Sequence, residues 1–268
     1  MEETIKMTDI QNQYKNASNL QTRITIHELY SENKQDWHEW LFEQYKITPN
    51  SRILEIGCGD GSFWFKNKDR VPSTWHITLS DFSPGMLHSA KERLKELDSI
   101  HYLQFNIEEI PFEDNSMDVI IANHMLYHVP DRKKGVGEIR RVLKPGGVFY
   151  ASTIGENHMK EFGELVNEFD QSLNFDSALE HARQFGVENG EKQLRSFFDQ
   201  IVYKDFPGDL HITDEKAVAD YILSSNTDVG RSLGDERLIE FLHFLKTKKD
   251  SNNGFIKISK STGLFTST

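Results

Sequence analysis

Cysteine and long apolar runs are what this 268-residue chain most clearly lacks. Cys58 is the only cysteine, which excludes an intramolecular disulfide and a cysteine-based metal cage and indicates a reducing compartment. No stretch approaches the roughly 18 apolar residues that a membrane-spanning helix requires, and the N-terminus lacks a basic region followed by an apolar run. We therefore expect neither secretion nor a membrane span, and we predict a cytoplasmic location.

Positive charge is also in short supply. The chain carries 31 lysine and arginine residues against 42 aspartate and glutamate residues, a formal net charge of −11. Binding to a nucleic-acid backbone is driven by clustered lysine and arginine, so we predict a small-molecule partner and no nucleic acid. The hydrophobic content of 37% is nevertheless typical of a folded globular chain, because it offsets the entropy lost on ordering.

Apolar runs typical of buried strands alternate with helical patterns between residues 49 and 155. The runs predict strands at 52–56, 75–79, 101–105, 117–122 and 147–153. Helical patterns lie between them, near 62–69, 84–97 and 131–143. Strands separated by helices imply βαβ crossovers, so the sequence predicts an α/β domain whose parallel sheet is covered on both faces.

The two flanks of this region have different patterns. Residues 1–48 predict two helices that form an N-terminal cap, in front of a core at 49–155. Residues 156–268 predict a helical lid with antiparallel strands that complete the edge of the sheet. Helical patterns cover 156–185 and 214–248, strands at 200–206 and 210–213 flank the turn Pro207-Gly208-Asp209, and 255–265 predicts a terminal hairpin.

A glycine-rich turn follows the first predicted strand. Gly57, Gly59 and Gly61 form the pattern G-x-G-x-G, and glycines there permit close approach of the backbone to a ligand at the carboxyl ends of the strands. Asp81 ends the second strand 20 positions after Gly61, where a carboxylate accepts hydrogen bonds from ribose hydroxyls. The turn differs from the pyrophosphate-binding G-x-G-x-x-G of nicotinamide enzymes, so it favours a nucleoside ligand without phosphates.

These residues, with the run from Thr78 to Leu87 and the run from Phe105 to Thr153, resemble class I S-adenosylmethionine (SAM) dependent methyltransferases. The resemblance is strongest to the small-molecule type that includes ubiquinone and menaquinone C-methyltransferases. It implies a doubly wound, mostly parallel seven-stranded sheet of the Rossmann-like kind. It also implies an enzyme that transfers a methyl group from SAM to a small organic acceptor by in-line displacement, with S-adenosylhomocysteine (SAH) as the product.

The resemblance also assigns residues to the parts of the cofactor. Those that line its methionine and ribose are Glu55, Gly57, Cys58, Gly59 and Asp81. Those around its adenine are Phe82 and Met86 beside the ring and Asn106 and Ile107 at its edge, where the family usually has an acidic and a small residue. The asparagine carbonyl and the Ile107 N–H retain the required acceptor and donor. Asn123 and His124 follow the fourth strand toward the methyl group, and Tyr14, Arg23 and His27 lie in a leader that folds over the cofactor.

Catalytic residues are less marked than cofactor residues. His128 is the candidate general base for an acceptor hydroxyl or amine. His124 and His128 lie four apart, a spacing that places two side chains on one helical face, but no third ligand accompanies them and we predict no metal. Two alternatives stay open: a nicotinamide-dependent oxidoreductase on a similar fold, and a SAM-binding module without catalysis.

Overall fold

The computed structural model describes residues 19–268, except residues 98, 174, 176 and 226. The chain divides into two compact units. The sheet unit comprises Gln35–Glu156, His181–Phe206 and Ser261–Thr268, and the helical unit comprises residues up to Lys34, Asn157–Glu180 and Pro207–Lys260. Each unit is therefore assembled from segments that are distant in sequence.

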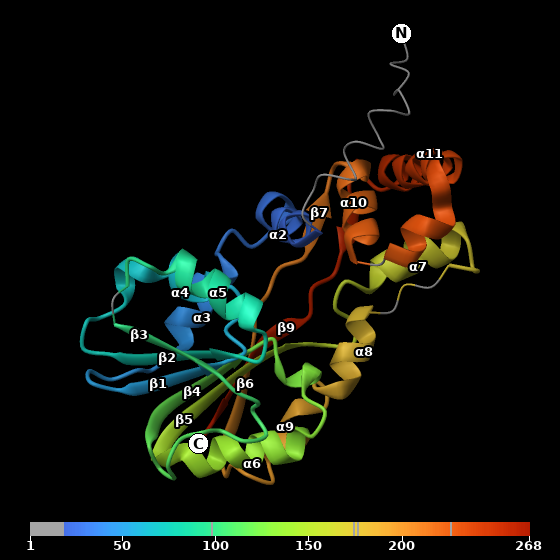
Figure 1. Cartoon of the computed structure of the whole chain (residues 1–268). Helices are drawn as coiled ribbons and strands as arrows, with labels where there is room; N and C mark the ends of the chain where they lie inside the picture. The colour runs from blue at the N-terminus through green and yellow to red at the C-terminus, as the bar shows by residue number, and fades with distance from the viewer. Residues whose placement is uncertain (1–18, 98, 174, 176, 226) are drawn as a thin grey trace. The chain divides into compact units, whose positions relative to one another are not determined.

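A seven-stranded sheet with the order β3-β2-β1-β4-β5-β9-β6 forms the centre of the sheet unit (Figure 1). Its strands are β1 Arg52–Ile56, β2 His76–Asp81, β3 Ile100–Gln104, β4 Met117–Asn123, β5 Leu143–Ile154, β6 Ile201–Asp205 and β9 Thr262–Ser267. Strands β1 to β5 pair in parallel, whereas β9 is antiparallel to both β5 and β6. The predicted doubly wound, mostly parallel sheet is confirmed, and its strand order reverses between β1 and β4, where such sheets bind ligands.

Helices cover both faces of this sheet (Figure 1). They are α3 Trp37–Gln44, α4 Ser62–Lys66, α5 Pro84–Arg93, α6 Arg132–Val142 and α9 Gly190–Leu194, with short 3-10 turns η1 Lys68–Arg70 and η2 Leu126–His128. Side chains of β1 alternate between the faces: Ile53 packs in the hydrophobic cluster of α3, α4 and α5, and Leu54 packs in that of α6 and α9. This alternation explains why a run that is apolar on both faces forms a central strand.

Polar residues fix where three of these helices begin. The Asp36 side chain accepts hydrogen bonds from the backbone N–H groups of His38 and Glu39 at the start of α3. Ser83 caps α5, where Pro84 occupies the first turn, and Asp131 caps α6. Such caps satisfy N–H groups that have no partner within the helix.

The helical unit has its own core. It contains α2 Asn19–Tyr30, α7 Lys160–Phe169, α10 Glu215–Ser225, α11 Thr227–Ser251 and the antiparallel pair β7 Leu210–Ile212 and β8 Ile256–Ile258. Phe162, Ile222 and Phe241 are among its buried residues. Helix α8, Ser177–Gln184, spans the boundary between the two sets of segments. Among the residues described, no helix combines the length and the apolar character needed to cross a bilayer.

Two predicted strand pairings are wrong. The segments at 200–206 and 210–213 do not form a hairpin, because β6 pairs with β9 and β7 pairs with β8 in the other unit. For the same reason the segment 255–265 is not a hairpin: β8 and β9 belong to different sheets. Lys260 between them donates its backbone N–H to the Asp209 carboxylate instead of closing a turn. The predicted antiparallel edge is nevertheless confirmed by β6 and β9.

Candidate functional site

The glycine turn after β1 has a left-handed backbone at each glycine, with φ of 70° at Gly57, 57° at Gly59 and 77° at Gly61. A Cβ atom at Gly57 would lie 2.8 Å from Cβ of Met125, and one at Gly61 would lie 2.8 Å from Cδ1 of Leu94. A Cβ at Gly59 would meet nothing within 4 Å. Packing therefore requires the first and third glycines, and the middle one leaves open space of the kind a ligand needs.

Asp81 closes the turn from the end of β2. Its Oδ2 accepts the backbone N–H of Gly59 at 2.9 Å, and its Oδ1 accepts that of Ser83 at 2.8 Å. An ionised carboxylate has about four acceptor sites, so each oxygen retains capacity for a ligand hydroxyl. The structure thus places Asp81 in direct contact with the glycine turn, a pairing that the sequence indicated only by the spacing of these residues.

Cys58 lies inside the turn as a buried thiol. Its backbone N–H donates to the carbonyl of Ser80 at 2.9 Å, which ties the turn to β2. Burial and the nearby carboxylates of Glu55 and Asp81 raise the pKa of the thiol well above its usual range. The side chain is therefore a neutral thiol at physiological pH, which suits a packing residue rather than a nucleophile.

Glu55 is 1% exposed and belongs to a buried polar network. Its Oε2 accepts the indole N–H of Trp64 at 2.5 Å, and its Oε1 accepts the Asn123 amide at 3.0 Å. Burial, with a smaller contribution from the charge of Asp81, raises the pKa of Glu55 to about 7, although the two hydrogen bonds oppose this. The carboxylate therefore fixes the Asn123 side chain between β1 and β4.

The same network shapes the end of β4. Oδ1 of Asn123 accepts the Tyr45 hydroxyl at 2.8 Å and the Ser152 hydroxyl at 3.2 Å. His124 has φ of 49°, and its N–H donates to the Ser152 carbonyl at 3.2 Å and hydroxyl at 3.1 Å. A left-handed histidine is uncommon, and such strain concentrates at functional sites. Trp64 and Ser152 were not predicted from the sequence, and Tyr45 was predicted only as part of a helical pattern, although a buried indole N–H or phenol requires a partner.

Two large apolar side chains stay exposed beside Asp81. Phe82 is 73% exposed and Met86 is 43% exposed, at the carboxyl end of β2 and in the first turn of α5. Gln104 at the end of β3 donates its amide to the Phe82 carbonyl at 3.0 Å. Exposed apolar surface next to a carboxylate that faces a glycine turn is what an adenosine-like ligand would cover.

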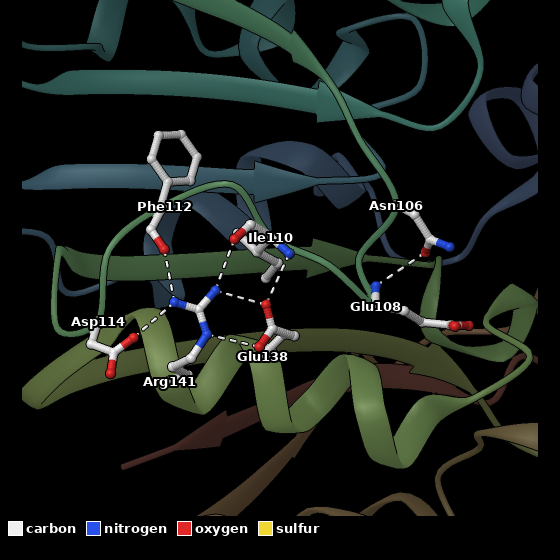
Figure 2. A network of polar contacts seen from close by, with 7 residues as sticks. All are labelled: Asn106, Glu108, Ile110, Phe112, Asp114, Glu138 and Arg141. Atoms are coloured by element: carbon white, nitrogen blue, oxygen red, sulfur yellow. Dashed lines mark hydrogen bonds and ion pairs between the residues drawn. The ribbon is translucent and has the colours of Figure 1, made fainter.

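Asn106 and Ile107 lie in the loop after β3. Oδ1 of Asn106 accepts the backbone N–H of Glu108 at 3.0 Å (Figure 2), and Asn106 is exposed. The Ile107 side chain is buried at 6% exposure. The loop therefore presents the Asn106 amide and holds its backbone through Ile107.

His128 lies in a cluster of polar rings. Its imidazole is 4.5 Å from the Tyr127 ring and 4.9 Å from the His181 ring of α8, measured between centroids. Partial burial and the neighbouring His181 lower its pKa. His124 lies outside the 3-10 turn η2, so the two histidines do not share a helical face as their spacing had predicted. The described residues contain no cluster of three or more metal-ligating side chains.

Three residues expected near the cofactor lie outside the sheet unit or outside the described residues. Tyr14 falls in the part of the chain that the structure does not describe. Arg23 and His27 lie on α2 of the helical unit, where burial lowers the pKa of His27 to about 4. Their contact with the cofactor stays a prediction, as does the division into cap, core and lid.

Known proteins resemble the central part of the sheet unit in sequence. Residues 54–151 match the model of the methyltransferase domain family. The chain is 34% identical over 114 residues to the ubiquinone/menaquinone biosynthesis C-methyltransferase UbiE of Vibrio parahaemolyticus, a match that covers 41% of this chain and 44% of that relative. The match therefore spans less than half the length of that relative.

Solved structures extend the likeness of fold. The YcgJ protein of Bacillus subtilis superposes with a TM-score of 0.55 at 19% identity, covering 85% of this chain and 96% of that one. A Haemonchus contortus phosphoethanolamine N-methyltransferase in complex with SAM superposes with a TM-score of 0.55 at 17% identity, covering 99% and 60%. These two structures show a shared fold, and the resemblance to class I SAM-dependent methyltransferases is confirmed by the matches to the methyltransferase domain family and to UbiE.

Proposed function

We propose that this chain is an enzyme that transfers a methyl group from SAM to a small organic acceptor in the cytoplasm. The observation that carries the proposal is the turn of Gly57 and Gly59, in which the Gly59 N–H donates to the Asp81 carboxylate at 2.9 Å. The match to a methyltransferase domain over residues 54–151 supports it. A small acceptor is favoured by the net charge of −11, which disfavours a nucleic-acid substrate.

The residues of the sheet unit suit this chemistry. When bound, SAM supplies an electrophilic methyl carbon and a thioether leaving group. Asp81 holds the ribose through its remaining acceptor sites, Phe82 and Met86 cover the adenine, and the Asn123–His124 segment borders the methionine end. Methyl transfer mainly requires that the acceptor atom is aligned and water is excluded, so the site needs no charged catalytic triad.

Calorimetric titration of the purified full chain with SAM, SAH and NADH tests this proposal. We expect SAM and SAH to bind with low-micromolar affinity, about −8 kcal/mol, and NADH not to bind. Binding of NADH in their place would support the oxidoreductase alternative. Binding of SAM without SAH formation across a screen of hydroxyl and amine acceptors would favour a non-catalytic module. Absence of binding to all three contradicts the proposal.

His128 and His181 fit the removal of a proton from the acceptor. Met125 packs against Gly57, so the short turn that carries Tyr127 and His128 lies directly beside the glycine turn. An imidazole whose pKa is lowered is neutral at pH 7 and accepts a proton. Within this proposal His128 takes the proton of an acceptor hydroxyl or amine, and His181 holds the ring in place.

The pKa of His128 is expected to rise in a His181→Asn variant, because the charge of His181 is the second cause of its lowering after burial. Titration of the His128 ring resonances by NMR, from pH 4 to pH 9, measures this shift. His101→Asn, a change on the exposed side of β3, is the matched control and leaves the midpoint in place. An unchanged midpoint in His181→Asn would show that His181 does not influence the pKa of His128, and it would contradict the role proposed for His181.

A further inference from the structure

The loop between β3 and β4 is fastened to α6 by two side chains (Figure 2). The guanidinium of Arg141 donates from Nη2 to the Ile110 carbonyl and from Nη1 to the Phe112 carbonyl, each at 2.8 Å. Oε2 of Glu138 accepts the Ile110 N–H at 2.9 Å. Both polar groups of the Ile110 backbone are thus bound by α6, so this side of the loop is fixed by charged partners.

The guanidinium group of Arg141, whose nitrogens form a planar fork, is itself held by carboxylates. Nε and Nη2 donate to the two oxygens of Glu138 at 2.7 Å each, and Nη1 also donates to Asp114 at 2.8 Å (Figure 2). These contacts keep the pKa of Glu138 below its usual value. All three nitrogens of the guanidinium therefore have acceptors, an arrangement that a flexible ammonium cannot reproduce.

The contacts follow one face of α6. Gly135, Glu138 and Arg141 are spaced three apart, which places them along the same side of the helix. A Cβ at Gly135 would lie 3.4 Å from two side-chain atoms of Ile107, so that residue packs closely on the helix. The contacts between the loop and α6 therefore extend from Ile107 to Phe112 and begin directly after Asn106.

We propose that Arg141 and Glu138 are positioning residues for adenine recognition: they hold the loop so that the Asn106 amide and the Ile107 N–H meet the ring edge. The inference rests on the proposed function. A loop ordered before binding loses little conformational entropy when the ligand arrives, so donor and acceptor keep a fixed spacing. Without the guanidinium of Arg141, we expect the loop to adjust to the donors and acceptors of either adenine or hypoxanthine.

The test compares SAH with S-inosylhomocysteine by calorimetry, in wild type, Arg141→Lys and Glu138→Gln. Hypoxanthine carries an oxo group in place of the amino group and an N–H in place of the ring acceptor, so it mismatches both loop contacts. Two lost hydrogen bonds predict a preference of the wild type for SAH of roughly a hundredfold. Arg141→Lys keeps the charge but loses the fork, and we expect this preference to fall about tenfold.

Lys144→Gln is the matched control, because the Lys144–Asp118 ion pair of 2.7 Å joins β5 to β4 and does not join the loop to α6. We expect this variant to leave the preference for SAH unchanged. Equal weakening of both ligands in Arg141→Lys and Glu138→Gln, with the preference retained, would show a purely structural role and overturn the inference. A wild type that binds SAH without preferring it over the inosine analogue also overturns it. A wild type that binds neither ligand overturns the proposed function, and the inference with it.

Discussion

Replacing Asp81 by alanine is expected to weaken the binding of SAH by roughly 10- to 150-fold, the equivalent of about 1.5–3 kcal/mol for hydrogen bonds to a charged group. The carboxylate has two tasks that alanine removes together. It accepts the N–H groups of Gly59 and Ser83, and by our proposal it also accepts the ribose hydroxyls. Calorimetric titration of the variant against the wild type measures the loss.

Asp60→Ala supplies the matched control for this experiment. Asp60 lies in the same turn, but its carboxylate accepts from Ser62 and pairs with Arg93 at 2.7 Å. Its removal is expected to leave the affinity for SAH within about twofold. If Asp81→Ala and Asp60→Ala weaken binding equally, the effect lies in the folding of the turn, and the ribose assignment of Asp81 fails.

The central strands are predictable from sequence because their environment is simple. The run 52–56 matches β1 Arg52–Ile56, since a strand covered on both faces is buried at nearly every position and is therefore rich in apolar residues. Strand partners are not predictable in this way. Strands β6 and β7 adjoin in sequence yet pair with β9 and β8, because alternation of side chains specifies a strand's faces and leaves its neighbour open.

The residues of the candidate site also differ in how far the sequence predicts them. The glycines of the turn and Asp81 are visible in the sequence because a backbone conformation and a ribose contact each demand a narrow set of residue types. The hydrogen-bond partners of Glu55 cannot be predicted from the sequence. Trp64 and Tyr45 have the spacing of core residues and are indeed buried, and only the fold shows that their polar atoms converge on Glu55 and Asn123.

The stability of the wild type, measured relative to a Glu55→Gln variant, is expected to fall by about 3 kcal/mol as the pH rises from about 4.5 to about 7. The pKa of Glu55 is about 7 in the folded protein against an ordinary value of 4.5. Because the folded pKa is raised, the contribution is complete below pH 4.5 and is lost as pH rises through 7. Urea denaturation of both proteins at several pH values measures the difference, which cancels groups common to both.

The same proton should respond to the ligand. At pH 7 about half of the Glu55 carboxyls are protonated in the free protein, given a pKa of about 7. The sulfonium and ammonium charges of bound SAM favour the carboxylate, so SAM is expected to displace up to about half a proton, and SAH, which lacks the sulfonium, less. Calorimetry in buffers of different ionisation enthalpy measures the release. An equal difference between SAM and SAH in Glu55→Gln would assign the proton to another group and place Glu55 beyond the reach of the cofactor's charge.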